Sequence, residues 1–355
     1  MAPNSTDCGA SVTVESGRPT TSAVMFALGV AGNVAALALL ETRRRRKRPS
    51  PYRVLVTALV ATDLLGTVAV SPVVLDAYAT NTTLVAMAGR NAVCAYFGFS
   101  MTFLSLSTLS ILCAMALERF LSLGFPYFYD RHVTGTCCAY VTVALIYLAC
   151  VLYCAGPLAG FGGSYVQYCP GTWCFLDMSP SEPREAAYTG LYACFTLLVV
   201  ACTSVCNVSA ICFLVKMHRR QKTRRRRRST AGGGGARHAR FFRRSQSMTE
   251  EVEHLLPLVF ITAAFSICSF QFLLQVCINI MGGEKEPYAS DLYALRMLSF
   301  NSIVDPWVFI IFQPSMLKFI WKKLRRRRPC GPARPPCPSP AVEPRPQITS
   351  AMLDI

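Results

Sequence analysis

Long runs of apolar residues, separated by short polar stretches, dominate the chain. A bilayer core about 30 Å thick is crossed by about 20 apolar residues in helical conformation. Seven runs of that length occur, at residues 21–40, 54–79, 94–121, 136–159, 187–215, 255–281 and 292–312. A helix satisfies its backbone hydrogen bonds within one such run, whereas an open strand in lipid does not. The pattern therefore predicts an all-α membrane protein, a seven-transmembrane helix bundle.

Composition supports a membrane protein over the other classes that a basic chain suggests. Of the 355 residues, 52% are hydrophobic and 15% are charged, whereas about a quarter are charged in a typical soluble domain. So few charged groups would not cover a soluble protein, and the apolar content is too high for a disordered chain. The net charge of +17 would otherwise suit nucleic acid, but this hydropathy predicts no nucleic-acid partner.

The positions of the basic residues predict how the bundle is oriented. With the N-terminus extracellular, the connections after the first, third and fifth runs and the C-terminal tail face the cytosol. All but five of the 36 Lys and Arg residues then lie on the cytosolic side. Because positive charge is retained in the cytosol, this orientation is predicted and its inverse is rejected. The five exceptions are Arg18, Arg90, Arg184, Lys285 and Arg296.

The hydropathy pattern also divides the chain into parts. After the last apolar run, a short segment mixes aromatic with basic residues, as in a helix that lies on a membrane surface. The residues beyond it are rich in proline. We expect an extracellular N-terminus (1–20), the bundle (21–312) with a cytosolic loop at 216–254, an amphipathic cytosolic helix (313–324) and a disordered cytosolic tail (325–355).

Three arginine runs lie on the predicted cytosolic side, at residues 43–46, 224–228 and 325–328. They either bind anionic lipid of the inner leaflet or serve only to set the orientation, and the sequence leaves both readings open. Cys330 and Cys337 follow the last run, and they are either palmitoylated or free thiols.

Glycosylation sequons agree with this orientation. Asn4 and Asn81 each begin an Asn-x-Ser/Thr triplet on the predicted extracellular side, where glycans are added. A third sequon begins at Asn207, but it lies within the fifth apolar run and should stay unmodified.

Most of the 17 cysteines lie inside apolar runs, where they act as small apolar residues. Four lie on the predicted extracellular side, where disulfides form, and they allow three pairings that the sequence cannot separate. These four are Cys8, Cys94, Cys169 and Cys174. The chain has four histidines and lacks a Cys-x-x-Cys pair, so we expect neither a metal site nor a bound cofactor.

Ionisable residues inside the apolar runs are candidates for function because they are costly in lipid. Asp63 lies in the second run and Asp305 in the seventh, accompanied by Asn33 and Asn301. If the four meet at the centre of the bundle, they hold a cation or a water network that differs between two conformations. The alternative is that they only join helices through hydrogen bonds, at about 1 kcal/mol each.

Two arginines near the ends of runs also require an explanation. Arg119 follows Glu118 at the cytosolic end of the third run, and it either reaches to the interface or forms a latch with the acid. Arg296 lies about one turn inside the seventh run, where a permanent cation needs a partner. That partner is either Asp76, near the outer end of the second run, or a ligand carboxylate, which guanidinium binds through two parallel hydrogen bonds.

Arg296, the string DPWVF at 305–309 and the string VQYCPGTWCF at 166–175 resemble motifs of the rhodopsin-like G-protein-coupled receptors and, among them, of the prostanoid receptors. Arg296 precedes Ser299 by three residues and is followed by residues 305–309 (DPWVF), as in the seventh span of that family. The match extends over nearly all seven runs. It also includes residues 166–175 (VQYCPGTWCF), 62–67 (TDLLGT), 71–78 (SPVVLDAY) and 114–124 (AMALERFLSLG).

The resemblance implies a binding site for an acidic lipid. Arg296 and Tyr78 would hold the prostaglandin carboxylate together with Thr172, and Ser299 would serve hydroxyls of the ligand. A strand-like hairpin around Trp173 would cap the site. The apolar channel would be lined by Met25, Phe97, Met101, Trp173 and Leu292.

The resemblance also implies disulfides and a signalling partner. Cys94 would pair with Cys174, and Cys8 with Cys169. Within the family the chain most resembles the members that bind prostaglandin E, couple to the stimulatory G protein and raise cyclic AMP. Changes between two states would pass through the activation residues Glu118, Arg119, Asp63, Asp305 and Asn301.

Three residues depart from the family pattern. Gln271 stands where the sixth span usually carries a proline, and Pro257 lies nearly four turns closer to the cytosol. A proline frees a backbone carbonyl and kinks a helix, so the outward movement of the sixth span is in question. Phe125 stands where relatives often have histidine. Asp76 replaces a small residue near Tyr78, where it would compete for Arg296 and weaken ligand affinity.

The seven apolar runs together with the resemblance predict a plasma-membrane receptor for prostaglandin E rather than an enzyme. Rival interpretations are a receptor for prostaglandin D or prostacyclin, which share several of the motifs, and a transporter of organic anions or lipids that uses Arg296. An odd number of spans without internal repeats disfavours the transporter. Motifs such as HExxH or a P-loop are missing, which disfavours an enzyme.

Overall fold

The computed structural model describes most of the chain, in seven stretches. Outside them lie Asn4, Cys8, Cys330 and Cys337, the expected amphipathic helix at 313–324 and the expected tail at 325–355. The described stretches are residues 11–14, 19–44, 50–87, 91–178, 182–229, 236–280 and 289–312.

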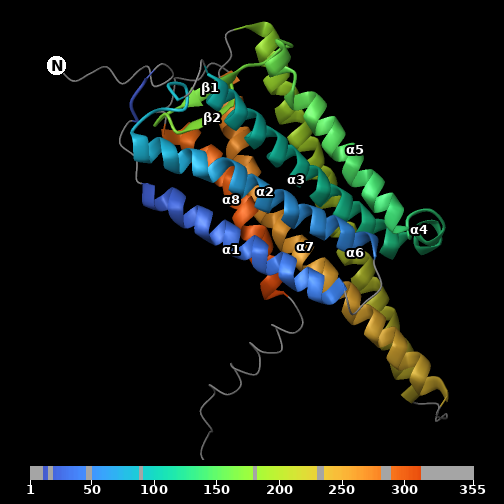
Figure 1. Cartoon of the computed structure of the whole chain (residues 1–355). Coiled ribbons are helices and arrows are strands. Elements are labelled where there is room, and N and C mark those ends of the chain that lie inside the picture. Colours follow the sequence, from blue (N-terminus) through green and yellow to red (C-terminus); the bar gives the residue numbers. More distant parts are fainter. Residues whose placement is uncertain are drawn as a thin grey trace, which may run out of the picture.

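Seven of the described helices are long and apolar enough to cross a membrane, which confirms the predicted bundle (Figure 1). Each predicted apolar run coincides to within a few residues with the membrane-spanning stretch of one of these helices. A further helix, α4 (Pro126–His132), and a short 3-10 turn, η1 (Pro157–Ala159), lie in connections. The seven are α1 (Pro19–Arg44), α2 (Pro51–Thr80), α3 (Ala92–Gly124), α5 (Thr136–Cys154), α6 (Pro183–Ser229), α7 (Ala236–Ile280) and α8 (Ala289–Ile311).

Helix α3 lies at the centre of the bundle. It packs against α2, α5, α6 and α7 and against both strands. Two thirds of its most apolar stretch is buried by protein, compared with 22% in α1 and in α5. The outer helices therefore leave apolar side chains for lipid, as expected where the solvent is itself apolar.

Helices α6 and α7 both extend well beyond their apolar spans, as Figure 1 shows. The connection expected as a loop at 216–254 is helical over 216–229 and 236–254. Arginine, lysine and glutamine are good helix formers, so these polar residues continue α6 to Ser229 and allow α7 to begin at Ala236.

A β-hairpin covers one end of the bundle, which we call the hairpin end. Strands β1 (Tyr165–Tyr168) and β2 (Trp173–Leu176) pair antiparallel, with Tyr168 opposite Trp173. The turn includes a cis Cys169–Pro170 bond and Gly171, whose φ of 95° suits glycine. A β-carbon on Gly171 would lie 2.5 Å from the Thr83 side chain, so the turn also needs glycine for its close approach to the α2–α3 connection.

The buried apolar residues form two clusters along the bundle axis. The cluster at the hairpin end surrounds Phe97, Phe175 and Phe272, and it joins the hairpin to α3 and α7. The other cluster surrounds Leu59 and Met115 in the opposite half. On α2 and α3 the buried polar residues Asp63 and Thr108 lie between the residues of the two clusters.

Candidate functional site

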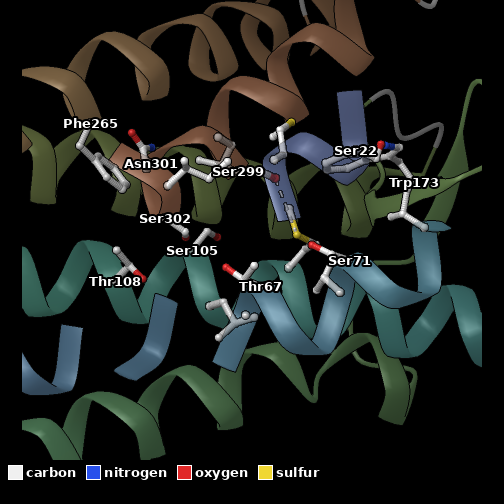
Figure 2. A pocket seen from close by; sticks show the side chains of 18 residues that line it. Ser22, Thr67, Ser71, Ser105, Thr108, Trp173, Phe265, Ser299, Asn301 and Ser302 are labelled. Carbon is white, nitrogen blue, oxygen red and sulfur yellow. Dashed lines mark hydrogen bonds between the residues drawn. The ribbon is translucent and has the colours of Figure 1, made fainter. Parts of the chain in front are cut away.

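A cavity opens beneath the hairpin and continues toward the centre of the bundle (Figure 2). It encloses about 800 Å³ of space without atoms, part of which is open to solvent at the mouth. Residues of α1, α2, α3, α7, α8 and β2 line it. Its apolar side chains are Met25, Val70, Val74, Met101, Leu104, Trp173, Phe265, Leu298 and Ile303, and its polar ones are Ser22, Thr67, Ser71, Ser105, Thr108, Ser299, Asn301 and Ser302.

The cavity is elongated. In Figure 2, Trp173 and Ser22 lie at one end, and Phe265, Asn301 and Thr108 lie at the other. Apolar walls with a few hydroxyl groups are typical of sites for small, largely apolar ligands.

Trp173 is held in the wall of the cavity by its neighbours. Its side chain is buried, and its ring packs edge-on against Phe97 with centroids 5.8 Å apart. The next residue, Cys174, forms a disulfide with Cys94 of α3. The indole nitrogen of Trp173 has no hydrogen-bond partner among the described residues. A buried N–H without a partner is costly, so Trp173 offers a donor to a molecule in the cavity.

Arg296 lies on α8, one turn closer to the hairpin end than Ser299. It is half-buried, and within the described part of the chain it forms neither an ion pair nor a hydrogen bond. Arg296 is not one of the residues that line the cavity. Asp76, one of its two predicted partners, is exposed and lines a separate groove beside Val93. The expected alternative of an Arg296–Asp76 ion pair is therefore wrong, because the α2 helix directs Asp76 away from the bundle.

Four of the nine ligand residues expected from the resemblance line the cavity: Met25, Met101, Trp173 and Ser299. The Ser299 hydroxyl lies 3.9 Å from the Met101 sulfur and donates to the Leu295 carbonyl at 3.1 Å. This pair joins α3 to α8 within the cavity wall.

The other five surround the cavity without lining it. The Thr172 hydroxyl lies 3.5 Å from the Tyr78 hydroxyl, so these two residues are neighbours under the hairpin, as the resemblance implies. Phe97 lies behind Trp173, and Leu292 packs against the same apolar cluster. Arg296, the fifth, is described above.

The sequence analysis missed most of the hydroxyl groups of the cavity. Ser105 and Thr108 of α3, and Ser299 and Ser302 of α8, are each three residues apart. Residues at this spacing share one face of a helix. The spacing was therefore a usable signal, although it does not say which helix the face meets.

Polar residues meet at the centre of the bundle. The Thr108 hydroxyl donates to the Asp63 carboxylate at 3.2 Å, and the Asn33 amide donates to the Ser302 carbonyl at 3.1 Å. Asp305 and Asn301 are fully buried, and none of their side-chain polar atoms has a partner within the described residues. The described residues contain no group of three or more His, Cys, Asp or Glu side chains suited to a metal.

Glu118 and Arg119 form a buried ion pair at the end of the bundle opposite the hairpin. Two nitrogens of Arg119 donate to the two Glu118 oxygens at 2.5 and 2.6 Å, and the Tyr129 hydroxyl of α4 donates to Glu118 at 2.6 Å. Both charged side chains are less than a tenth exposed. The sequence left two interpretations of Arg119 open, a latch formed with Glu118 or a side chain that reaches to the membrane interface. The ion pair agrees with the first.

The disulfide prediction is confirmed for Cys94 and Cys174, whose α-carbons are 5.4 Å apart. Cys169 is also disulfide-bonded, while Cys8 lies outside the described residues. Of the sequons, Asn81 is exposed at the end of α2, and Asn207 is buried and donates to the Thr262 hydroxyl at 2.7 Å.

The departures in the sixth span also have clear positions. Gln271 is exposed on the outer surface of α7, and the helix continues through it. Pro257 lies inside the same helix, closer to the opposite end. Phe125 is half exposed beside α4 and packs edge-on against Phe120.

Comparison with solved structures supports the fold. The chain superposes on squid rhodopsin with a TM-score of 0.70, and 89% of each chain is covered at 14% identity. At this identity the likeness concerns the fold alone.

Comparison with other sequences identifies the family. The model of the family described as "7 transmembrane receptor (rhodopsin family)" matches residues 32–309. The chain is 45% identical over 311 residues to the prostaglandin E2 receptor EP2 subtype of Homo sapiens, covering 85% of this chain and 84% of that receptor. It is 40% identical over 301 residues to the prostacyclin receptor of Homo sapiens, covering 84% and 74%. These relatives are receptors rather than enzymes, and the chain belongs to the rhodopsin family of seven-transmembrane receptors and, within it, to the prostanoid receptors.

Proposed function

We propose that this chain is a plasma-membrane receptor for prostaglandin E that activates the stimulatory G protein and raises cyclic AMP. The observation that carries the proposal is Arg296, a half-buried cation without a partner in the described structure, one turn beyond the cavity residue Ser299. An acidic lipid needs a cation for its carboxylate and an apolar slot for its chain. The named prostaglandin E2 and prostacyclin receptors support the same ligand class.

The ligand would span the length of the cavity. Its carboxylate would bind Arg296, near the neighbouring hydroxyls of Tyr78 and Thr172. Guanidinium binds carboxylate through two parallel charge-assisted hydrogen bonds, which fixes the direction of the ligand. The hydrocarbon chains would then lie against Met25 and Met101, with Ser299 available to a ligand hydroxyl.

The signal would reach the G protein at the opposite end of the bundle. We infer that this end faces the cytosol, because the predicted cytosolic connections hold nearly all the basic residues. Arg119 would leave Glu118 when the ends of α6 and α7 separate. The buried polar groups of Asp63, Asn301 and Asp305 would then change partners between the two states. An agonist shifts this equilibrium only by binding the active state more tightly.

Substitution of Arg296 tests the ligand site. We expect Arg296→Ala to weaken binding of radiolabelled prostaglandin E by about 100-fold, or about 3 kcal/mol, because the charge-assisted hydrogen bonds are lost. Arg296→Lys should weaken binding less, because it retains the charge but not the bidentate geometry. Arg184→Ala is the matched control, since Arg184 is exposed at the beginning of α6. Equal affinities of the Arg296→Ala and Arg184→Ala receptors would contradict the carboxylate anchor.

Cyclic AMP measurement tests the coupling. Cells that express the chain should respond to prostaglandin E with a rise in cyclic AMP, at concentrations that Arg296→Ala increases in proportion to the loss of affinity. A receptor present at the surface that binds prostaglandin E without such a rise would contradict coupling to the stimulatory G protein.

Prostacyclin is the second candidate ligand, because the 40% identity to the prostacyclin receptor is close to the 45% identity to the prostaglandin E2 receptor. Competition binding with prostaglandin E, prostaglandin D and a stable prostacyclin analogue separates these ligands. We expect prostaglandin E to compete at the lowest concentration.

A further inference from the structure

A tyrosine at the beginning of α2 covers the guanidinium of Arg119. The centre of the Tyr52 ring lies 4.5 Å from the Arg119 Cζ atom, and the Tyr52 side chain is buried. This distance lies well within the range over which a cation is attracted to an aromatic face. Tyr52 therefore contacts the same side chain that Glu118 binds, but from another helix.

The start of α2 fixes the position of Tyr52. Ser50 has an extended backbone, Pro51 is the first helical residue, and the Arg53 amide donates to the Ser50 carbonyl at 3.1 Å. Proline is pre-organised for the first turn of a helix, so the helix begins there and Tyr52 is held in its first turn. Leu55 and Val56 follow on the same helix, and they are buried in the apolar cluster of this half of the bundle.

The contacts of Arg119 divide between its edge and its face. The nitrogens donate in the guanidinium plane to Glu118, which in turn accepts from the Tyr129 hydroxyl. An aromatic ring attracts a cation through its face, where the guanidinium makes no hydrogen bonds. The ion pair and the ring therefore act on Arg119 together without competing for the same atoms.

Burial strengthens the contribution of the ring. Arg119, Glu118 and Tyr52 are each less than a tenth exposed, so water does not screen the cation. A movement of Arg119 out of this arrangement would break both its pair with Glu118 and its contact with the Tyr52 ring. A residue that stabilises one position of Arg119 in this way shifts the equilibrium between resting and active states.

We propose that Tyr52 is a positioning residue, whose ring face holds Arg119 in its resting arrangement with Glu118. The inference rests on the proposed function, in which Arg119 must leave this arrangement when the G protein binds.

The test compares Tyr52→Phe with Tyr52→Leu. Phenylalanine keeps the aromatic face, whereas leucine fills similar space without it. We expect Tyr52→Leu to raise basal cyclic AMP, normalised to receptor at the cell surface, by about 5- to 30-fold, the size expected from loss of a buried cation–aromatic contact. Basal cyclic AMP in the Tyr52→Phe variant should stay near the wild-type level. Equal increases in both variants would assign the effect to the hydroxyl and overturn the proposal.

A matched control and a ligand readout exclude general destabilisation. Tyr140→Leu makes the same change at an exposed tyrosine of α5, and it should leave basal signalling unchanged. Affinity for prostaglandin E should not fall in the Tyr52 variants, because Tyr52 lies in the other half of the bundle and a shift toward the active state can only raise agonist affinity. If Tyr52→Leu lowers basal signalling, or if Tyr140→Leu raises it equally, the proposal is wrong.

A direct measurement separates this proposal from the proposed function. In purified receptor labelled with 15N-arginine, the Arg119 Nε–H resonance, assigned with Arg119→Lys, should carry a ring-current shift. Tyr52→Leu should remove the shift and Tyr52→Phe should keep it. An Arg119 resonance unchanged by Tyr52→Leu would overturn the positioning role. Absence of any prostaglandin response in the wild type, with the ring-current result as expected, would overturn only the proposed function.

Discussion

Individual side chains of the cavity have unusual hydrogen-bonding states. Trp173 and Asn301 both line the cavity, and both are buried with polar atoms that lack partners among the described residues. A buried polar group without a partner costs about 1–3 kcal/mol. Among the described residues, Arg296 also has neither an ion pair nor a hydrogen bond. Side chains that a protein leaves unsatisfied around a cavity are available to a ligand that supplies the missing partners.

The donor on Trp173 leads to a prediction at this scale. Trp173→Phe keeps an aromatic ring against Phe97 but removes the N–H group, so prostaglandin E affinity should fall by about 3- to 10-fold, the size of one neutral hydrogen bond. Competition binding measures the change. Trp307→Phe is the control, because that indole faces Gly32 of α1 outside the cavity. An unchanged affinity for Trp173→Phe would show that the ligand does not accept from this nitrogen.

At the scale of elements, the hairpin depends on close contact with α3. Gly98 of α3 lies under Tyr165 of β1, and a β-carbon on Gly98 would be 2.5 Å from the Tyr165 ring. The Tyr165 hydroxyl donates to the Cys154 carbonyl at 2.9 Å, which fixes the ring between α3 and α5. Together with the Cys94–Cys174 disulfide, this contact holds the hairpin over the cavity.

Gly98→Ala should therefore destabilise the hairpin end. The extra methyl group has to displace a ring that is held at both ends, so we expect a loss of about 1–3 kcal/mol in stability and weaker ligand binding. Thermal unfolding of the purified receptor measures the stability. Gly190→Ala is the matched control, because no atom lies within 4 Å of that added β-carbon, and alanine is the better helix former. A Gly98→Ala receptor as stable as the control would show that the hairpin can shift at no cost.

At the scale of the whole molecule, the cavity and the Glu118–Arg119 pair lie toward opposite ends of one helix. Met101 lines the cavity and Arg119 belongs to the same helix α3, about 27 Å farther along its axis at 1.5 Å per residue. Between them, Thr108 both lines the cavity and donates to Asp63. This arrangement gives a ligand in the cavity a physical connection to the buried polar residues.

The orientation of the whole molecule can be tested through its sequons. If the N-terminus is extracellular, Asn81 is exposed on the outside and should carry a glycan, so Asn81→Gln should lower the apparent mass and remove one site for an N-glycosidase. Asn207→Gln should leave the mass unchanged, because Asn207 is buried and donates to Thr262. An unglycosylated Asn81 in a receptor that reaches the surface would contradict this expectation. An N-terminal tag that is accessible from the cytosol would show that the orientation is the inverse of the one predicted.

The sequence by itself determined the number and order of the membrane-spanning helices and the position of the apolar stretch in each. Each span is recognised locally, because about 20 apolar residues must satisfy their own backbone hydrogen bonds in lipid. The motifs around Arg296 and residues 166–175 likewise predicted the family, the hairpin and one disulfide. Helix ends were less predictable, since good helix formers continue α6 and α7 past the apolar runs.

Only the tertiary structure decided which side chains meet. Asp76 lies two residues from Tyr78, yet the rotation of α2 about its axis exposes the acid and directs Tyr78 toward Thr172. Tyr52 and Arg119 are far apart in sequence, and only the packing of α2 against α3 brings the ring over the guanidinium. Helix rotation and packing depend on many simultaneous contacts between helices, whereas the apolar pattern of one segment records only its preference for lipid.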